Sequence, residues 1–548
     1  MLYCQCLCVL FYQDCTQAMN LVLIYVHFIT RSLSSMLLKS GIIVSVMTLL
    51  SRVLGLVRDV VVANLMGAGA SADVFFFANK IPNFLRRLFA EGAFAQAFVP
   101  VLSQVHAQDD RKLSLDFIAK ISGTLGMIVF FTAVFGVIAS PVIAALFGTG
   151  WFIAFVNDEP DGQKFELAST MLKITFPYLF FITLTGLSGA ILNTLNRFAV
   201  AAFTPVLLNI SIITCAWLLH DQFSTPAFAL AWGVFFGGLI QLAFQLPFLY
   251  RAGVLVRPRW GWSDPNVKKV RTLMIPALFG VSVSQINLLF DTLIASFLMT
   301  GSVSWLYYSD RLLEFPLGLF GIAIATVILP ALSRDHVSQD KDKFQRNMNW
   351  ALTMVCALGI PSCLGLMVLA QPILSVIFER GAFTANDVSM AGMSLLAYAA
   401  GLVSFMLIKI FAPGYYARQD TKTPVKFGII AMIANMGFNI IFAVPFGYVG
   451  LAIATSLSAT LNAFLLYRGL VKAGVYRCES LVVWRLLKML LAAAVMALCV
   501  WFLREQIDWS VLDFTARIGY VCAWLSAALL TYVSALLVLG VRPSDFKS

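Results

Sequence analysis

The chain has 548 residues, of which 60% are hydrophobic and only 12% are charged. Soluble domains carry roughly 25% charged residues, so this composition excludes a soluble globular protein. Because one membrane-spanning helix uses about 20 apolar residues, apolar runs along the whole chain predict a polytopic membrane protein. These runs are longer than the segments of about 10 residues that build membrane β-barrels, so we expect an all-helical fold.

Residues 1–35 differ from the rest of the sequence. Their apolar run Leu21–Ile29 is too short to span a membrane, and the first basic residue, Arg31, follows it, whereas a secretory signal begins with its basic segment. The first fifteen residues also hold four cysteines, Cys4, Cys6, Cys8 and Cys15. Without histidine partners these cysteines predict no zinc site. We expect an N-terminal extension of unknown role, with Met36 or Met19 as a more natural start.

Apolar runs interrupted by turn residues and charges predict fourteen membrane-spanning helices. Their approximate ranges are 40–65, 72–102, 114–147, 165–194, 199–219, 226–250, 269–299, 303–333, 345–378, 386–417, 423–443, 448–469, 482–503 and 515–540. An even number of spans places both ends of the chain on the same side of the membrane.

Basic residues are distributed unequally between the loops. One alternate set of loops, together with the termini, holds 24 lysines and arginines, whereas the opposite set holds only Lys164, Arg380, Arg504 and Arg517. The positive-inside rule therefore predicts that both termini are cytoplasmic. The net charge of +11 would indicate nucleic-acid binding in a soluble protein, but here it resides mostly at helix ends, so we expect no nucleic-acid partner.

The two halves of the chain resemble each other. The segment Ala93–Ser103 matches Ala323–Ser333, and Thr204–Val206 matches Thr423–Val425. Six spans in each copy give parallel repeats, as in transporters that bind substrate between their halves; chance similarity between alanine-rich helices is the alternative. The predicted domains are an N-terminal six-helix lobe at 36–252, a C-terminal six-helix lobe at 268–472 and two additional helices at 480–541.

Charged residues interrupt several predicted spans, where each costs at least about 2.5–3.5 kcal/mol unless it faces a cavity or a partner. In the span 72–102, Asp73, Lys80 and Arg87 recur every seven residues and so share one helical face. Arginine presents a planar set of donors that suits phosphate, which predicts an anionic substrate. The candidate residues are Arg52, Arg58, Asp73, Arg86, Arg87, Asp310, Arg311 and Glu314. Mutual pairing that only joins helices is the alternative, and we prefer it for Asp59 and Glu91.

The second half of the chain offers a candidate cation site. Asp291 lies within the span 269–299, Asn435 and Asn439 stand at i,i+4 in a later span, and Thr455 lies in the next one. One carboxylate with amide and hydroxyl oxygens suits a small hard cation, and we predict Na⁺ as a coupling ion. The alternative is that these residues form hydrogen bonds between membrane helices.

Enzyme motifs are absent from the sequence. No Walker loop, G-x-S-x-G or H-E-x-x-H occurs, only four histidines are present, and no loop is large enough for a soluble catalytic domain. We therefore expect a transporter, not an ATP-driven pump or an enzyme, and no cofactor apart from the coupling ion.

Several longer motifs resemble the MurJ (MviN) lipid II flippases. They are SRVLGLVRD (Ser51–Asp59), NFLRRLFAEGAF (Asn83–Phe94), GSVSWLYYSDRLLEFP (Gly301–Pro316) and APGYYARQD (Ala412–Asp420). The resemblance runs from about Met36 to the C-terminus. It implies membership of the multidrug, oligosaccharidyl-lipid and polysaccharide exporter superfamily, with fourteen helices.

The resemblance implies movement of lipid II, the undecaprenyl-pyrophosphate-linked disaccharide pentapeptide, from the inner to the outer leaflet of the bacterial cytoplasmic (inner) membrane. This step serves peptidoglycan synthesis, cell-wall biogenesis and cell shape. It also implies that the charged candidates line a central cavity and that the last two spans form a groove for the lipid tail. We expect a monomer whose partners are lipid II, membrane lipid and cell-wall synthesis enzymes. Departures from the family are residues 1–35 and Asp291, where some members carry an amide.

Our hypothesis is an alternating-access flippase in which arginines bind the pyrophosphate, while Asp73, Asp310 and Glu314 position them or contact the head. The nearest alternative is an exporter of another polyprenyl-linked saccharide or of drugs, although an arginine excess disfavours cationic drugs. A membrane glycosyltransferase would need acidic catalytic loops, whereas the outer loops carry only the acidic cluster 158–161. A scaffold for cell-wall enzymes would leave the intramembrane arginines without a role.

Overall fold

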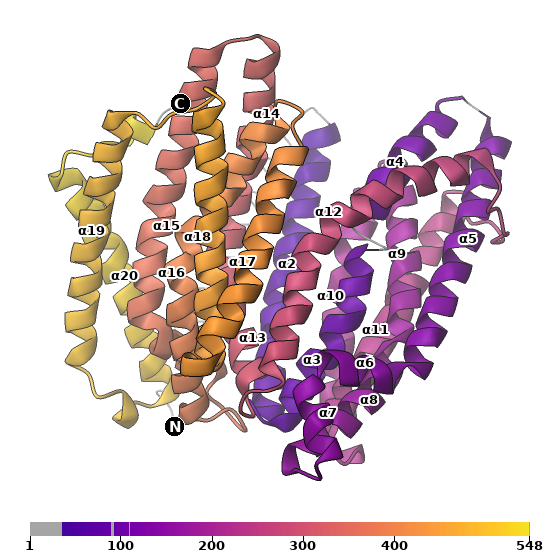
Figure 1. Cartoon of the computed structure of the whole chain (residues 1–548), viewed down its shortest axis with the longest axis horizontal. Coiled ribbons are helices and arrows are strands. Elements are labelled where there is room, and N and C mark those ends of the chain that lie inside the picture. Colours follow the sequence, from indigo (N-terminus) through magenta and orange to yellow (C-terminus); the bar gives the residue numbers. More distant parts are fainter. Residues whose placement is uncertain (1–35, 89–92, 109, 547–548) are drawn as a thin grey trace, which may run out of the picture.

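The computed structural model describes residues 36–88, 93–108 and 110–546, and every regular element among them is a helix (Figure 1). The predicted all-helical class is confirmed. The predictions for residues 1–35 and for Glu91 lie outside the described residues. The α-helices are α2 (Met36–Met66), α3 (Ala70–Arg86), α4 (Ala93–His106), α5 (Arg111–Ile138), α6 (Ser140–Phe147), α7 (Thr149–Val156), α8 (Gln163–Thr175), α9 (Pro177–Thr194), α10 (Phe198–Leu219), α11 (Pro226–Arg251), α12 (Pro265–Ala295), α13 (Ser302–Pro316), α14 (Ile322–Val337), α15 (Lys341–Phe378), α16 (Ala385–Tyr416), α17 (Lys422–Phe446), α18 (Tyr448–Lys472), α19 (Ser480–Glu505) and α20 (Phe514–Val538).

All fourteen predicted ranges contain helix, and described residues divide three of them. These hold α5 with α6, α8 with α9, and α13 with α14, whereas residues outside the described part of the chain lie between α3 and α4. Proline marks all three divisions: Pro141 is the second residue of α6, Pro177 is the first residue of α9, where its missing N–H costs nothing, and Pro316 ends α13. Between α13 and α14 the chain forms a π-helical turn, η4 (Leu317–Gly321).

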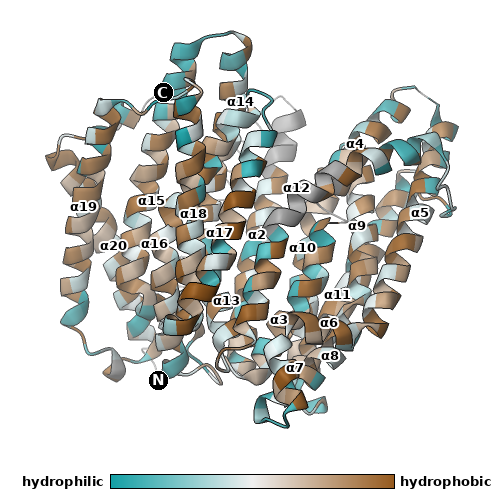
Figure 2. Cartoon of the chain, in the orientation of Figure 1, coloured by the Kyte–Doolittle hydropathy of each residue, from teal (hydrophilic) through white to brown (hydrophobic). Residues whose placement is uncertain are grey.

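Eleven helical segments in the described part of the chain are long and apolar enough to cross a membrane. They correspond to eleven of the predicted spans, and α2, α3 with α4, and α12 are not among them. Large apolar side chains point outward from these segments, including Phe135, Ile138 and Val538, which are 67%, 74% and 87% exposed. Figure 2 shows apolar residues along the helices and hydrophilic residues mainly in the connections at their ends. The chain is a multi-pass membrane protein, and the number fourteen stays a prediction.

The helices form two groups and an additional pair at one edge of the molecule. In the first group, α10 packs against α2, α9 and α11, and α4 packs against α9; in the second, α16 packs against α15 and α18, and α17 packs against α18. Helix α12 contacts α4 of the first group and α17 of the second, and it runs obliquely between them in Figure 1. Helices α19 and α20 pack on each other and on α15 at one edge of the molecule. The proposed sequence repeat itself stays a prediction.

The two groups meet at the ends of the helices that are joined by the loops poor in basic residues. There the Ala382 N–H donates to the Asn64 carbonyl at 2.9 Å, and the Gly150 N–H donates to Ser296 Oγ at 3.0 Å. Gly67 has a φ of +58°, and a Cβ on it would lie 2.3 Å from the Ala382 carbonyl oxygen. Only glycine fits this close contact between the end of α2 and the α15–α16 loop.

Candidate functional site

A cavity of about 1600 Å³ lies between the two groups of helices and extends between α15, α19 and α20. The lining residues of α9, α10 and α11 lie mainly in the helix halves next to the basic loops, such as Asn193 near the end of α9, and Arg52 lies at the middle of α2. The charged lining residues are Arg52, Arg58, Asp59, Lys80, Arg86, Arg87, Asp310, Arg311, Glu314 and Lys409. The structure thus brings seven of the eight predicted substrate-site residues into one chamber.

The charged lining residues of α2 and α13 form a charged wall, made of Arg52, Arg58, Asp59, Asp310, Arg311 and Glu314. Asp59 lies at its centre. Its carboxylate is 1% exposed, and its Oδ1 accepts hydrogen bonds from Arg58 Nη2 at 2.7 Å and from the Tyr307 hydroxyl at 3.0 Å. Its Oδ2 accepts from Arg311 Nε at 2.7 Å. Arg58 Nη1 also donates to Asn209 Oδ1 at 3.1 Å. The predicted pairing of Asp59 with Arg58 is confirmed, and the same carboxylate binds a second arginine from α13.

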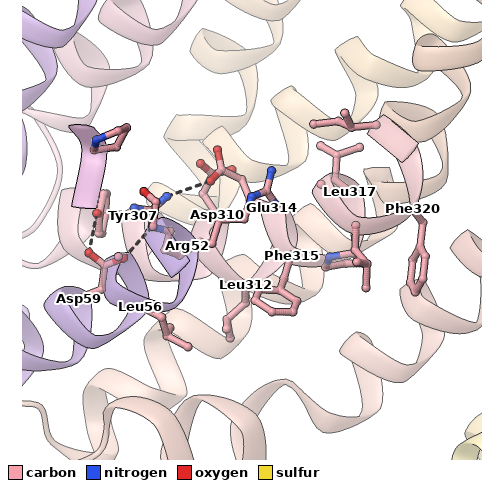
Figure 3. Close-up of a pocket in the computed structure, with 18 of the residues that line it drawn as sticks. Arg52, Leu56, Asp59, Tyr307, Asp310, Leu312, Glu314, Phe315, Leu317 and Phe320 are labelled. Atoms are coloured by element: carbon pink, nitrogen blue, oxygen red, sulfur yellow. Dashed lines mark hydrogen bonds and ion pairs between the residues drawn. The ribbon is translucent and has the colours of Figure 1, made fainter. Parts of the chain in front are cut away.

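The other charges of α2 and α13 face the same space (Figure 3). Glu314 Oε2 accepts from Arg311 Nη1 at 3.0 Å. Asp310 and Arg52 make no hydrogen bond or ion pair with the residues that the structure describes. The Arg52 guanidinium lies against η4, because a Cβ on Gly318 would be 2.2 Å from its Nη1.

Helix α3 supplies three further basic residues to the cavity. Arg87 Nη1 donates to Gln285 Oε1 of α12 at 3.3 Å, and Lys80 Nζ donates to Thr292 Oγ1 of α12 at 3.3 Å. Arg86 Nε donates to Asn83 Oδ1 of the same helix at 3.0 Å. These contacts place basic groups of α3 between the cavity and α12.

Asp73 corrects the prediction for this helix, because it does not line the cavity. The side chain is 2% exposed. Its Oδ2 accepts from the Gly301 N–H at 2.7 Å, and its Oδ1 accepts from the Ser304 N–H at 2.9 Å and the Ser304 hydroxyl at 2.6 Å. These donors belong to the first turn of α13, whose free N–H groups need acceptors. Asp73 therefore joins α3 to the N-terminus of α13.

The candidate cation-site residues also come together. Asn439 Nδ2 donates to Asp291 Oδ1 at 2.5 Å, and the Asn435 amide lies next to Asn439 and Asp291, whereas the Thr455 hydroxyl donates to a carbonyl of its own helix. Asn439 Oδ1 is buried without a hydrogen-bond partner, which leaves one oxygen available to a cation. Carboxylate and amide oxygens are ligands that suit hard cations better than transition metals. No group of three His, Cys, Asp or Glu side chains that could hold a metal ion occurs among the described residues. Asn287 approaches the Asn435 amide within 2.8 Å.

Three contributors to these sites were missed in the sequence. Tyr307 and Asn209 bind the charged pair but carry no charge of their own, so nothing in the sequence marks them. Lys409 lies inside a predicted span, and that position was the available signal. The apolar arm of the cavity is formed by α15, α19 and α20, and its lining looks like any lipid-facing helix surface.

An all-helical membrane chain with one charged cavity between two groups of helices defines a polytopic membrane transporter. The profile of the family described as "Lipid II flippase MurJ" matches residues 62–519, and the chain belongs to this family. A relative from Vibrio cholerae, "Probable lipid II flippase MurJ", is 62% identical over 94% of this chain and 99% of its own length.

Solved structures give the same picture of the fold. The structure "Lipid II flippase MurJ, inward closed conformation" has a TM-score of 0.75 and 28% sequence identity, and covers 91% of this chain and 100% of its own. An inward-facing multidrug resistance MATE family transporter of the MOP superfamily has a TM-score of 0.62 at 13% identity, and covers 79% of this chain and 98% of its own. At that identity the likeness concerns the fold alone.

Proposed function

We propose that the protein is a lipid II flippase, which carries the polar head of the undecaprenyl-pyrophosphate-linked precursor through its centre while the prenyl tail remains in lipid. One observation carries the proposal: a single cavity joins a chamber lined by basic residues to an arm lined by apolar ones. The arm includes Leu369 of α15, Val500 of α19 and Leu529 of α20. A lipid with a large charged head needs both environments in one continuous space.

Different residues of the charged wall bind different groups of the substrate head. Asp59 holds Arg58 and Arg311 side by side, so these two arginines present ordered N–H donors with much of their charge already compensated. Asp310 and Glu314 offer carboxylate oxygens to hydroxyl and amide donors of the sugar and peptide. Arg52 offers an uncompensated guanidinium for phosphate.

The proposed transport mechanism is alternating access, and contacts at one end of the protein support it. Contacts such as Asn64 with Ala382 and Gly150 with Ser296 seal the end that carries few basic residues, and the cavity lies toward the opposite end. With both termini in the cytoplasm, this is an inward-facing state. Rocking of the two lobes, 36–252 and 268–472, would separate these contacts and open the cavity to the outer side.

A Na⁺ ion bound by Asp291, Asn435 and Asn439 is the proposed coupling ion. The orphaned Asn439 oxygen and the Asp291 carboxylate support it, because a bound cation would complete the contacts of both. Asp291→Asn should abolish Na⁺-dependent thermal stabilisation of the purified protein while the same concentration of K⁺ has no effect on either form. Equal stabilisation of both forms by Na⁺ would contradict the site.

The proposed location is the bacterial inner membrane, with cytoplasmic termini and helices α19 and α20 forming the tail groove. We expect the monomer to be the flipping unit. Cell-wall synthesis enzymes, which supply and consume lipid II, are the proposed protein partners.

The test of the function is leaflet exchange of lipid II by purified protein in liposomes, with and without a Na⁺ gradient. Wild-type protein should exchange lipid II faster than protein-free liposomes, and Arg52→Gln should slow the exchange at least tenfold. Arg346→Gln, a change of the same charge at an exposed position near the start of α15, is the matched control. Full exchange by Arg52→Gln would contradict this role of Arg52, and no exchange by the wild-type protein would favour the scaffold alternative.

A drug exporter on the same scaffold is the second candidate. The cavity is lined by seven basic residues and three acidic ones, a balance that repels cations. Export of a cationic dye from liposomes without any exchange of lipid II would favour that alternative.

A further inference from the structure

The basic residues of the cavity differ in how much of their charge is already compensated. Arg58 and Arg311 share both oxygens of Asp59, and Arg311 also binds Glu314. By contrast, Arg52 and Lys409 make no ion pair or hydrogen bond with any residue of the described part of the chain. Lys80 and Arg87 donate only to the uncharged partners Thr292 and Gln285, so Arg52 and Lys409 differ from the other basic lining residues in that their donors are free of any described protein partner. An anion can therefore bind these two cations without displacing a protein contact.

Arg52 lies beside the π-helical turn η4, and Lys409 lies on α16, the helix that packs against this turn. The Arg52 guanidinium contacts it at Gly318, where an added Cβ would be 2.2 Å from Nη1. Helix α16 contacts the same turn at Gly321, where an added Cβ would be 3.5 Å from Met406 Cγ. Lys409 follows Met406 by three residues, which places it on the same face of α16, about 4.5 Å nearer the cytoplasmic end.

Lys409 is the residue that α16 contributes to the described lining of the cavity. The described lining residues from α15, α16, α19 and α20 include one charged side chain, that of Lys409. The others from these helices are apolar or uncharged, including Pro361, Leu366, Leu525 and Tyr532. A lysine inside a membrane span is costly unless it serves a cavity or a partner, and no carboxylate of the described residues pairs with it.

A polyprenyl diphosphate lipid carries its charge between an apolar tail and a polar head. With the tail in the apolar arm and the head in the chamber, the diphosphate must lie where the two parts meet. We propose that Lys409 and Arg52 bind this diphosphate. This inference rests on the proposed flippase function and assigns the two charges of the diphosphate diester to the two cations whose donors have no described protein partner.

The assignment separates the diphosphate from the Asp59 cluster. Arg58 and Arg311 then act mainly on the sugar and peptide head, to which ordered N–H donors matter more than net charge. Lys409 becomes a binding residue for the common lipid part of the substrate and is indifferent to the composition of the head.

The test compares three lipid probes that differ only at the charged end: undecaprenyl diphosphate, undecaprenyl monophosphate and uncharged undecaprenol. Binding to purified protein in nanodiscs is measured by native mass spectrometry. Lys409→Gln should weaken binding of the diphosphate about tenfold, as expected for the loss of one charge-assisted hydrogen bond. It should weaken binding of the monophosphate less and leave undecaprenol unchanged. Lys409→Arg should stay within about threefold of wild type, because the charge is kept.

Lys488→Gln is the matched control, since Lys488 lies near the cytoplasmic end of the neighbouring helix α19 and does not line the cavity. It should bind all three probes as wild type does. A merely structural role of Lys409 would change the binding of all three probes equally, and that outcome overturns the inference.

The inference and the function fail in different ways. If wild-type protein neither binds nor exchanges lipid II, the proposed function is wrong. If wild-type protein exchanges lipid II, and Lys409→Gln binds undecaprenyl diphosphate as tightly as wild type, the assignment of Lys409 is wrong and the function stands.

Discussion

At the scale of single residues, Asp59 shows how one carboxylate organises a membrane cavity. Taking an ion pair out of water is expensive, and the attraction between the partners roughly repays that expense only when the geometry and additional hydrogen bonds are good. Here Tyr307 supplies such a bond and is itself held by stacking on Phe76, with ring centroids 3.9 Å apart. Asp59 is therefore a positioning residue for Arg58 and Arg311.

Replacing Asp59 tests that role. Asp59→Asn leaves two adjacent arginines without their shared carboxylate, and removing one partner of a buried ion pair costs roughly 3–5 kcal/mol. We expect a lower unfolding temperature in detergent and loss of lipid II exchange. In Asp59→Asn/Arg58→Gln, part of the stability should return because one uncompensated charge is gone, but exchange should not. Recovery of exchange in the double variant would contradict a positioning role.

Asp73 should affect conformation and leave binding unchanged. Asp73→Asn removes the negative charge at the N-terminus of α13, and loss of such a cap typically costs about 1 kcal/mol. We expect the closed outer end to open more often, which lowers the disulfide yield between cysteines introduced at Asn64 and Ala382 in a cysteine-free background. Lipid II binding should stay within about twofold of wild type. Asp342→Asn, an exposed change of the same kind in the first turn of α15, should alter neither.

The sequence predicted which residues would line the cavity better than it predicted their partners. Arg52, Arg58 and Arg311 stood out because arginine inside a span is costly. Asp59 and Arg311 are 252 residues apart, so their shared ion pair follows only from the packing of α2 on α13. The seven-residue spacing of Asp73 grouped it with Lys80 correctly along α3, but the helix extends beyond the cavity at the end where Asp73 lies.

At the scale of helices, contacts of Asp264 hold the start of α12 in place. Asp264 precedes the helix, accepts from the backbone N–H groups of Asn266 and Val267, and pairs with Lys120 of α5 at 2.9 Å. These contacts fix the start of the helix that runs between the two groups. The loop before it is fixed as well, because the Arg259 N–H donates to the Ala119 carbonyl of α5 at 2.8 Å.

The Asp264 contacts give a pH-dependent contribution to stability. Burial raises the pKa of this carboxyl, but the Lys120 ammonium and the backbone N–H groups outweigh it and hold the pKa below its ordinary value. A carboxyl whose pKa is lowered by folding stabilises the fold above its unfolded pKa and loses this effect as the pH falls through its folded pKa. Wild type should therefore unfold at a higher temperature than Asp264→Asn at pH 7, with the gap shrinking below about pH 4. A constant gap across this range would show that the carboxylate charge is irrelevant.

Helix positions were largely predictable, and their interruptions were not. Apolar length predicts where a chain enters and leaves a membrane, whereas the division of α8 from α9 at Pro177 depends on whether neighbouring helices tolerate a bend there. Pro205 and Pro247 remain inside α10 and α11. A proline in a membrane helix is thus compatible with both outcomes, and packing decides between them.

At the scale of the whole molecule, one cavity contains both a chamber lined by charged residues and an arm lined by apolar residues. Gly365 of α15 lines the cavity, and a Cβ on it would have no neighbour within 4 Å. Gly365→Phe should therefore fill space without displacing protein atoms. We expect unchanged thermal stability, weaker binding of lipid II with its full-length tail, and nearly unchanged binding of an analogue with a short prenyl chain. Gly428→Ala, also in open space but outside the cavity, serves as the control, and equal loss for both lipids would contradict a tail-binding arm.

The π-helical turn η4 between α13 and α14 bears on how such a cavity changes shape. A π turn spends about one residue more per turn than α geometry, so the helix stores a spare residue at the point that Arg52 touches. Shifting that residue into a neighbouring turn would rotate α14 relative to α13 by about 100° without unwinding either helix. Such a rotation would change the face that α14 presents to α15 and α16, its packing partners, while the charged residues of α13 stay in place.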